Sequence, residues 1–102
     1  MAQWLYLIHP PREDFIATIT PEEAEIMQDG HSAYLARLHA EGILILAGPT
    51  WGQPSNDGIA VIEAPDRVAA EAIMNTDPAV ASGLMTPELR EMRVAFLRGR
   101  DD

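Results

Sequence analysis

Short apolar runs, each closed by glycine or proline, alternate along the chain with longer amphipathic segments. Four of these runs have the length and residue types of β-strands, which carry β-branched and aromatic residues and end at turn residues. We predict strands over residues 3–9, 43–47, 59–64 and 89–97. In the last of these strands, Met92, Val94 and Phe96 are expected to share one face because side chains alternate along a strand.

The first long segment between strands carries the signals of a helix start and a helix end. Residues 20–23, Thr-Pro-Glu-Glu, combine a capping-box spacing with proline at the first helical position, and Gly42 marks the end. We expect Asp29-Gly30 to break or bend this helix, because glycine is a poor helix former. The better-formed part is then predicted over about residues 31–41.

The second such segment follows Pro65. Asp66 is the expected N-cap of a helix whose apolar side includes Val68, Ala69, Ala72 and Ile73, and which stops near residues 75–76. A short helical turn is then predicted from residue 77 to residue 81, before Gly83.

The resulting order of elements is β-α-β-β-α-β. This order is that of a ferredoxin-like α+β fold, in which a four-stranded antiparallel sheet carries both helices on one face. We expect a single domain over residues 1–98, followed by a short acidic tail over residues 99–102.

The predicted strands are apolar on both faces. The run at residues 43–47 has no polar position, and Trp4, Tyr6 and Ile8 alternate with Leu5 and Leu7. Two helices cover only one face of a four-stranded sheet, and an antiparallel strand exposed to water on one side normally alternates apolar with polar residues. We therefore predict a homodimer that packs sheet face against sheet face. The alternative is a monomer whose loops cover that face.

Composition narrows the choice of partners and of chemistry. The chain has 102 residues, of which 47% are apolar, and a formal charge of −9 that repels phosphate backbones and anionic lipids. We therefore expect no nucleic-acid and no membrane partner. Cysteine is absent and all seven basic residues are arginine, which removes disulfides, thiol nucleophiles and Schiff-base lysines. The short apolar stretch near the N-terminus lacks a basic leader, so a cytoplasmic location is expected.

His31 is the first candidate for chemistry. At 100° per residue it shares a helical stripe with Tyr34, Leu35 and Leu38, so it faces inward, where an imidazole can act as acid or base. The alternative is a core histidine whose ring is satisfied by a backbone carbonyl. Asp77 is the second candidate, although aspartate before proline at a helix start is ordinary capping. Both predicted helices lie on one sheet face, so the two side chains could be neighbours.

Other residues are candidates for binding a ligand. His9 and Arg12 could hold an anionic group or simply lie in a solvated loop, and Trp51 could form an aromatic pocket wall. The candidate substrate-binding residues are His9, Arg12, Tyr34, Gly48, Pro49, Trp51 and Ser82. No metal site is expected, since His31 and His39 do not share a helix face. Ser82 lacks the surroundings of a hydrolase nucleophile.

The ordered set His31-x2-Tyr34-Leu35, Glu41-Gly42, Ala47-Gly48-Pro49 and Asp77-Pro78 resembles the YCII-related family. The resemblance covers nearly the whole chain. It implies a ferredoxin-like fold that pairs into a dimeric α+β barrel, and a His/Asp pair in a cleft, which corresponds to His31 and Asp77. In this family an aromatic residue commonly follows the proline, whereas this chain has Ala79. The resemblance therefore implies a pocket of different shape.

These observations predict a small cofactor-independent enzyme. His31 would move a proton on a small cyclic or phenolic organic substrate, while Asp77 would hold the imidazole tautomer and stabilise its charged form. Lyase, dehydrochlorinase or isomerase chemistry suits this pair. Two alternatives remain open: a binding module that holds a small molecule unchanged in the same cleft, and an accessory dimerisation domain.

Overall fold

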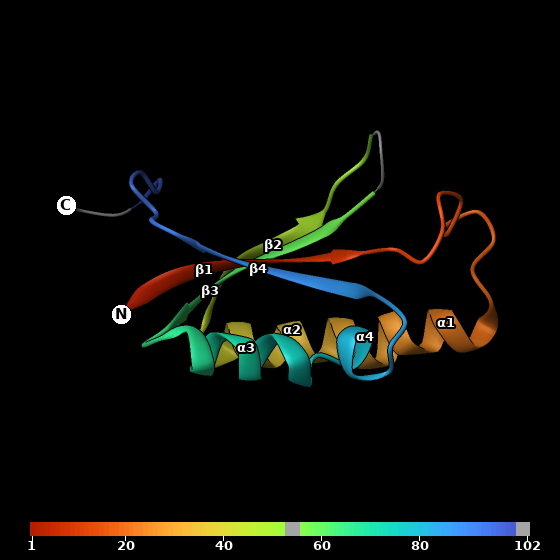
Figure 1. Ribbon diagram of the computed structural model, residues 1–102, viewed down its shortest axis with the longest axis horizontal. Coiled ribbons are helices and arrows are strands. Elements are labelled where there is room, and N and C mark those ends of the chain that lie inside the picture. Colours follow the sequence, from red (N-terminus) through yellow and green to blue (C-terminus); the bar gives the residue numbers. More distant parts are fainter. Residues whose placement is uncertain (53–55, 100–102) are drawn as a thin grey trace.

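The chain folds into one sheet and a layer of helices, as a computed structural model covering residues 1–52 and 56–99 describes it. The elements in chain order are β1 (Ala2–His9), α1 (Pro21–Glu25), the π-helix η1 (Ile26–Ser32), α2 (Ala33–Ala40), β2 (Leu44–Pro49), β3 (Gly58–Ala64), α3 (Arg67–Thr76), α4 (Pro78–Ala81) and β4 (Thr86–Met92). Figure 1 shows the helices together on one side of the sheet.

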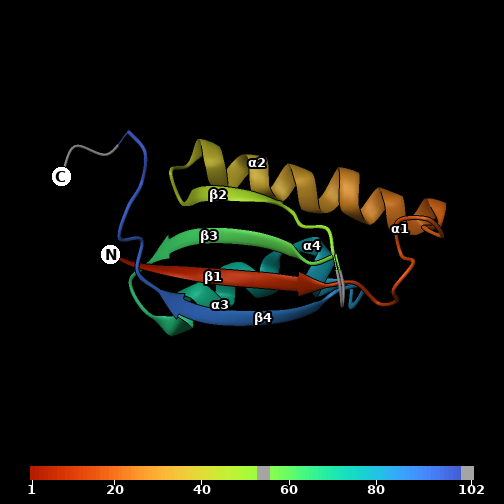
Figure 2. The ribbon, with the colours of Figure 1, turned by 90° about the horizontal axis from the view of Figure 1, so that it is seen from above.

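The sheet has four strands in the order β2-β3-β1-β4, and all neighbouring strands are antiparallel. β1 lies at the centre beside β3 and β4, so the first βαβ unit is split by β3 (Figure 2). Leu5 pairs with Val61 on one side and with Arg90 on the other. The predicted ferredoxin-like α+β fold is confirmed.

The core lies between the sheet and the helices. Trp4, Tyr6 and Ile8 alternate along β1 and are buried, as are Ala60 and Ile62 on β3. The α3 helix begins where the sequence predicts, because the Asp66 side chain accepts a hydrogen bond from the N–H of Ala69 at 2.9 Å. Arg67 extends over the Trp4 ring, with its guanidinium carbon 5.5 Å from the ring centre.

The opposite face of the sheet carries apolar side chains, and no helix of the described residues covers it. Leu5 and Leu7 of β1 are half-buried there, Leu46 of β2 is 47% exposed, and Val61 of β3 lies among them. Charged residues of β4, Glu88 and Arg90 among them, occupy the same face. Pairing of two protomers through this face stays a prediction.

The long helix differs from the expectation at Asp29-Gly30. The chain is not interrupted there, because residues Ile26–Ser32 form a π-helix that continues from α1 into α2. A π-helical turn holds an extra residue and often marks a functional site. Gly30 has a separate role: a Cβ at this position would lie 2.8 Å from the Cβ of Pro78 in α4. The glycine therefore allows η1 and α4 to approach closely.

Two predicted strands differ from the observed strands by more than one residue at an end. β2 continues through Gly48 and Pro49, because both still pair with β3, whereas the sequence placed its end at residue 47. The prediction for the last strand is wrong at both ends, since β4 spans Thr86–Met92 rather than residues 89–97. Met92 pairs with Gln3 near the start of β1, so the sheet offers no partner strand beyond it. Phe96 is 96% exposed and does not share a strand face with Met92.

Within residues 1–52 and 56–99, no helix combines the length and the apolar character that crossing a lipid bilayer requires.

Candidate active site

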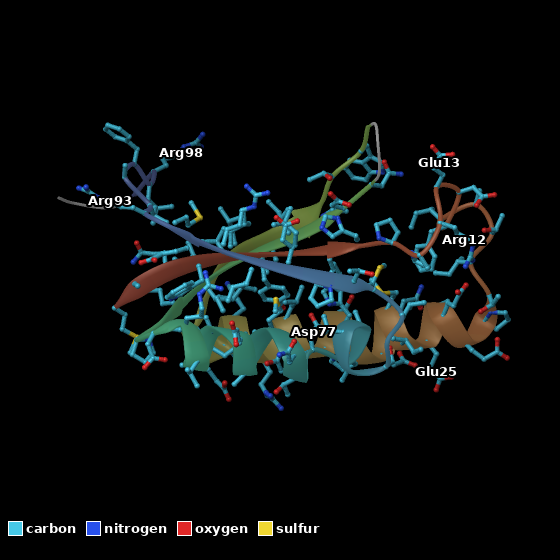
Figure 3. All side chains as sticks on the ribbon, in the orientation of Figure 1. Arg12, Glu13, Glu25, Asp77, Arg93 and Arg98 are labelled. Carbon is cyan, nitrogen blue, oxygen red and sulfur yellow. The ribbon has the colours of Figure 1, made fainter. Side chains whose placement is uncertain are left out.

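Three side chains from separate elements meet beneath the sheet. His31 comes from η1, Asp77 from the start of α4 and Tyr6 from the middle of β1. The His31 Nδ1 atom lies 2.7 Å from the Asp77 Oδ2 atom, and the Tyr6 hydroxyl donates to the same oxygen at 2.9 Å. Asp77 lies on the helical side of the sheet (Figure 3), where its side chain is 0% exposed.

Local sequence places Asp77 at this point. It ends α3 and caps α4, with an extended backbone between the two helices, and Pro78 fixes the first position of α4. Its Oδ1 atom accepts the backbone N–H of Ala79 at 2.9 Å. The capping role that the sequence offered as an alternative is therefore present together with the contact to His31, because the two carboxylate oxygens have different partners.

The π-helix and Gly30 place His31. Gly30 precedes His31 and allows η1 to pack directly on Pro78, which follows Asp77. Two neighbouring residues of η1 therefore face two neighbouring residues at the start of α4. Gly30 faces Pro78, and His31 faces Asp77. The imidazole is held between η1 and α4 with 14% of its side chain exposed.

The hydrogen bonds around Asp77 indicate which groups donate a proton and which accept one. As a carboxylate, Asp77 accepts from Tyr6, Ala79 and the His31 Nδ1–H. Burial, followed by the neighbouring Asp77, raises the pKa of Tyr6 far above its usual value, so this phenol stays neutral and donates. The neutral imidazole then carries its proton on Nδ1. Its Nε2 atom is left with a lone pair that can accept a proton.

His31 also lines a cavity of about 500 Å³. The walls come from α1, η1 and α2, from β2, from the ends of β1 and β3, and from the loop after β1, among other segments. The lining is Ile8, Phe15, Ile16, Ile19, Ala24, Met27, Gln28, His31, Ser32, Leu35, Ala47, Gly48, Pro49, Asn56, Gly58, Ile59 and Met85. Among these described residues, His31 is the one titratable side chain. A ligand here would contact mostly apolar groups, with one imidazole and a few uncharged polar groups beside it.

Two of the sequence-predicted binding residues, Gly48 and Pro49, line this cavity. Three others lie elsewhere. Tyr34 is buried and donates its hydroxyl to the Ile73 carbonyl at 2.7 Å, which fixes it to α3. Trp51 is 79% exposed, and Ser82 lies on the surface, where its Oγ accepts the N–H of Leu84 at 3.3 Å.

His9 and Arg12 also lie outside the lining, because each has carboxylate partners of its own. The two ring nitrogens of His9 are 2.9 Å from Asp57 and 3.0 Å from Glu88. The Arg12 guanidinium donates to both carboxylate oxygens of Glu23. Neither cation is therefore directed at the cavity.

Sequence reasoning did not identify Tyr6 as a site residue, nor the cavity walls at Phe15, Ile16 and Met85. One signal for Tyr6 is present in the sequence: a tyrosine on the buried face of a central strand needs a hydrogen-bond partner for its hydroxyl. No comparable local signal exists for the walls, since they are ordinary apolar residues. Within the described residues, no group of three or more His, Asp or Glu side chains is placed to hold a metal ion.

The order of strands and the helices on one face of the sheet define a ferredoxin-like α+β fold. The family model of the YCII-related domain matches residues 3–93. The chain belongs to the YCII-related family, as its sequence motifs indicated.

Solved structures share this fold at low sequence identity. One is 5-chloro-2-hydroxyhydroquinone dehydrochlorinase from Burkholderia phenoliruptrix AC1100, in complex with 2,5-dihydroxybenzoquinone. It is 19% identical, has a TM-score of 0.63, and the match covers 89% of this chain and 93% of that chain. Another is an antibiotic biosynthesis monooxygenase, 14% identical with a TM-score of 0.50, where the match covers 93% of this chain and 99% of that one. No curated protein matches the sequence.

Proposed function

We propose that this protein is a small cofactor-independent enzyme in which His31 transfers a proton on an uncharged cyclic or aromatic molecule. The observation that carries the proposal is the 2.7 Å contact between His31 Nδ1 and a fully buried Asp77, on a histidine that also lines a cavity. A general base must reach its substrate and must present an unprotonated nitrogen. In this proposal His31 meets both conditions through Nε2, which carries a lone pair in the neutral tautomer that Asp77 favours.

The proposed step begins when Nε2 takes a proton from a C–H or O–H group of the bound molecule. His31 becomes an imidazolium, and Asp77 stabilises its charge across the Nδ1–H bond. The electron pair left on the substrate then expels a leaving group, such as chloride, from a nearby carbon. Alternatively, the pair is protonated at another atom by the same imidazolium, which gives an isomerisation. Positioned proton transfer of this kind contributes typically about 10²- to 10⁴-fold to rate.

Two further observations support this class of substrate. A cavity of about 500 Å³ falls within the range of small-molecule sites and exceeds the volume of a single substituted ring. Its described walls carry no arginine or lysine to pair with a carboxylate or phosphate. The dehydrochlorinase of the same fold acts, as its name states, on a chlorinated hydroquinone. Dehydrochlorination is therefore the first reaction to test.

We propose that the active form is a homodimer. Leu5, Leu7 and Leu46 lie on the sheet face that no helix covers, and full burial of such side chains contributes about 1.5 to 3 kcal/mol each. Sedimentation at micromolar concentration tests this assembly. A single protomer over the whole concentration range would contradict it.

The alternative function is a module that binds a small molecule without changing it. The observation in its favour is the predominance of apolar groups in the cavity, since such walls provide affinity without chemistry. The two functions differ in the fate of the ligand. A bound compound recovered unchanged after long incubation supports the binding module.

The test uses 5-chloro-2-hydroxyhydroquinone and a set of chlorinated and unchlorinated hydroquinones. Chloride release and incorporation of solvent deuterium are measured for the wild type and for His31→Gln. The proposal expects at least one compound to react and the variant to lose about 10²-fold or more of the rate. Equal rates for the two proteins would overturn the role of His31. No reaction with any compound, despite binding, would favour the alternative.

A further inference from the structure

The segment at residues 10–20, which we call the β1–α1 loop, forms one wall of the cavity. Phe15, Ile16 and Ile19 of this loop line the cavity that His31 also lines. Figures 1 and 2 show the loop leaving the end of β1 and returning to the start of α1. Phe15 is 3% exposed, whereas Ile16 is 66% exposed. One side chain of this wall is therefore packed inside, and another lies where the cavity opens to water.

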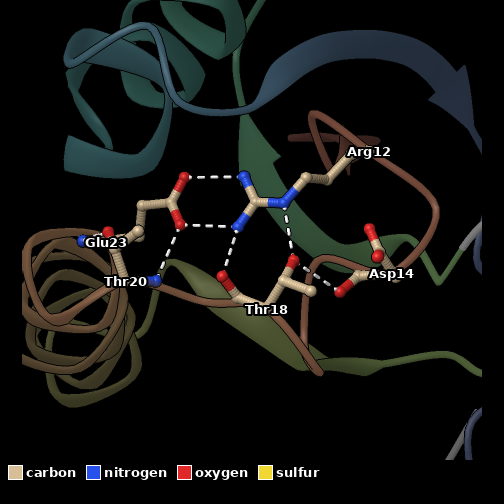
Figure 4. Close-up of polar contacts among 5 residues, drawn as sticks. All are labelled: Arg12, Asp14, Thr18, Thr20 and Glu23. Atoms are coloured by element: carbon tan, nitrogen blue, oxygen red, sulfur yellow. Dashed lines mark hydrogen bonds and ion pairs between the residues drawn. The ribbon is translucent and has the colours of Figure 1, made fainter.

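Arg12 holds the loop in place with four hydrogen bonds. Its Nε donates to the Thr18 hydroxyl at 2.8 Å and its Nη2 to the Thr18 carbonyl at 2.8 Å. Its Nη1 and Nη2 donate to the two carboxylate oxygens of Glu23, at 2.9 and 2.8 Å (Figure 4). Arginine presents its donors in a planar fork, so these contacts fix the direction of the side chain as well as its position.

Glu23 connects this arrangement to the helix. The same carboxylate accepts the backbone N–H of Thr20 at 2.9 Å, and the Thr20 hydroxyl accepts the N–H of Glu23 at 3.1 Å, which is a complete capping box. The Arg12 guanidinium beside it lowers the pKa of Glu23 to about 2. The ion pair therefore persists throughout the neutral range. It fastens the loop to the first turn of α1.

Arg12 also fixes one wall side chain directly. Its guanidinium carbon lies 5.2 Å from the centre of the Phe15 ring, which is the geometry of a cation–π contact. The Phe15 ring is therefore held between Arg12 on one side and the cavity on the other. Ile16 follows it in the chain, so the position of Ile16 depends on the same anchor.

We propose that the β1–α1 loop selects the molecule that the cavity accepts by its size. Ile16 is the specificity-determining residue, and Arg12 is a positioning residue that holds the wall. The inference rests on the proposed function for the identity of the site. An apolar side chain that is 66% exposed at the mouth of an apolar cavity is covered by a ligand long enough to reach it, and not by a shorter one. Ligands of two lengths should therefore respond differently to changes at Ile16.

The experiment measures the dissociation constants of phenol and of 1-naphthol, two uncharged ring probes of different length, by NMR titration. Ile16→Trp places a larger side chain at the mouth. We expect it to weaken 1-naphthol about fivefold or more and phenol less than about twofold. Ile16→Phe is a smaller change and is used in the same way if the tryptophan variant does not fold. Val68→Trp is the matched control, since Val68 is 77% exposed on α3 and does not line the cavity.

Arg12→Gln tests the positioning role. It removes the fork that holds Thr18, Glu23 and the Phe15 ring, so the preference for 1-naphthol over phenol should fall about threefold. Arg67→Gln is a close control: Arg67 also pairs with a glutamate, Glu71 at 3.7 Å, and also lies over an aromatic ring, that of Trp4. The ratio of the two dissociation constants is the informative quantity, because a general loss of stability weakens both probes alike.

Three results would overturn the inference: an unchanged ratio in the Ile16 and Arg12 variants, an equal change in the Val68 and Arg67 controls, or no binding of either probe by the wild type. A different result would contradict the proposed function. His31→Gln would then react as fast as the wild type, while the ratio of the two probes would still depend on Ile16. If the ratio of the two dissociation constants does not depend on Ile16 while turnover still depends on His31, the role of the loop is rejected and the proposed function is not.

Discussion

Two histidines in this protein are paired with carboxylates, and they differ in burial and in what their second nitrogen contacts. His31 bonds through Nδ1 to an Asp77 that is 0% exposed, and it lines the cavity. His9 lies between Asp57 and Glu88, with one carboxylate at each ring nitrogen and 32% of its side chain exposed. Within residues 1–52 and 56–99, the first arrangement leaves Nε2 without a hydrogen-bond partner. The second uses both nitrogens to link segments of the sheet.

A contact between a histidine and a carboxylate therefore does not by itself indicate a catalytic role. Hydrogen bonds that Asp57 and then Glu88 accept from the ring raise the pKa of His9, which favours an imidazolium that donates from both nitrogens. Such a cation has no lone pair with which to accept a proton. His31 instead contacts a single, fully buried carboxylate oxygen through Nδ1, and a carboxylate acceptor favours the neutral tautomer with its proton on that nitrogen. Burial of the partner and the number of partners separate the two roles.

Removing each imidazole in turn tests whether the two histidines have different roles. His31→Gln should lower the rate of the proposed reaction about 10²- to 10⁴-fold, because the general base is lost. His9→Gln should change it less than about threefold, since His9 does not line the cavity. Rates are measured on the reacting compound under identical conditions. Similar losses in both variants would erase the distinction drawn between the two histidines.

Removing the carboxylate charge is the next largest change. In Asp77→Asn an amide group replaces one carboxylate oxygen, so either the Ala79 N–H or both donors to Oδ2, from Tyr6 and His31, lose their acceptor. We expect a loss of about 1 to 3 kcal/mol in the free energy of unfolding. The rate should fall about 10-fold or more, because the imidazolium is no longer stabilised.

Asp57→Asn is the matched variant at His9. Its carboxylate is 22% exposed, and a solvent-exposed ion pair contributes about 0 to 1 kcal/mol. Urea unfolding measures both variants. An Asp77→Asn protein as stable as Asp57→Asn would show that the buried network contributes little.

Gly30→Ala tests the packing that brings His31 to Asp77. The new Cβ would lie 2.8 Å from the Pro78 Cβ, so η1 and α4 must separate. Overpacking of this kind costs about 1 to 3 kcal/mol, and the reaction rate should fall with it. Gly48→Ala has nothing within 4 Å of the added Cβ and should change stability by less than about 0.5 kcal/mol. If the two variants unfold alike, the close approach at Gly30 is not needed.

The smallest expected effect is a pH dependence from His9. Its folded-state pKa is raised above 6.5, so its contribution to stability is complete below pH 6.5 and is lost as pH rises through the raised value. The wild type should therefore lose about 1 to 4 °C in melting temperature over this interval relative to His9→Gln. Parallel curves for the two proteins would show that the His9 contacts do not contribute.

Much of the fold could be predicted from the sequence because its signals are local. Thr20 with Glu23, and Asp66, are caps that act within one helical turn, and both start helices as expected. The end of β4 could not be predicted, since it depends on where β1 begins. The π-helix was missed for a related reason: Gly30 reads locally as a breaker, and the contact with Pro78 that explains it lies far along the chain.

The site divides in the same way. His31 and Asp77 could be proposed from helix periodicity, capping and family resemblance, but their 2.7 Å contact depends on how η1 packs on α4. Tyr6 joins them only because β1 crosses above this point. Residues 10–19 lie between the predicted first strand and first helix, and nothing in their sequence indicates that Phe15 and Ile16 face a cavity. Arg12 was considered for binding an anion, whereas its guanidinium is occupied by Glu23.

The central claim is that Asp77 holds the neutral His31 ring with its proton on Nδ1, which leaves a lone pair on Nε2. Nitrogen-15 NMR of the imidazole rings measures this directly, because protonated and unprotonated ring nitrogens have well-separated chemical shifts. When the His31 ring is neutral, the account predicts that Nδ1 is protonated and Nε2 is not. A neutral His31 that carries its proton on Nε2 would contradict the account.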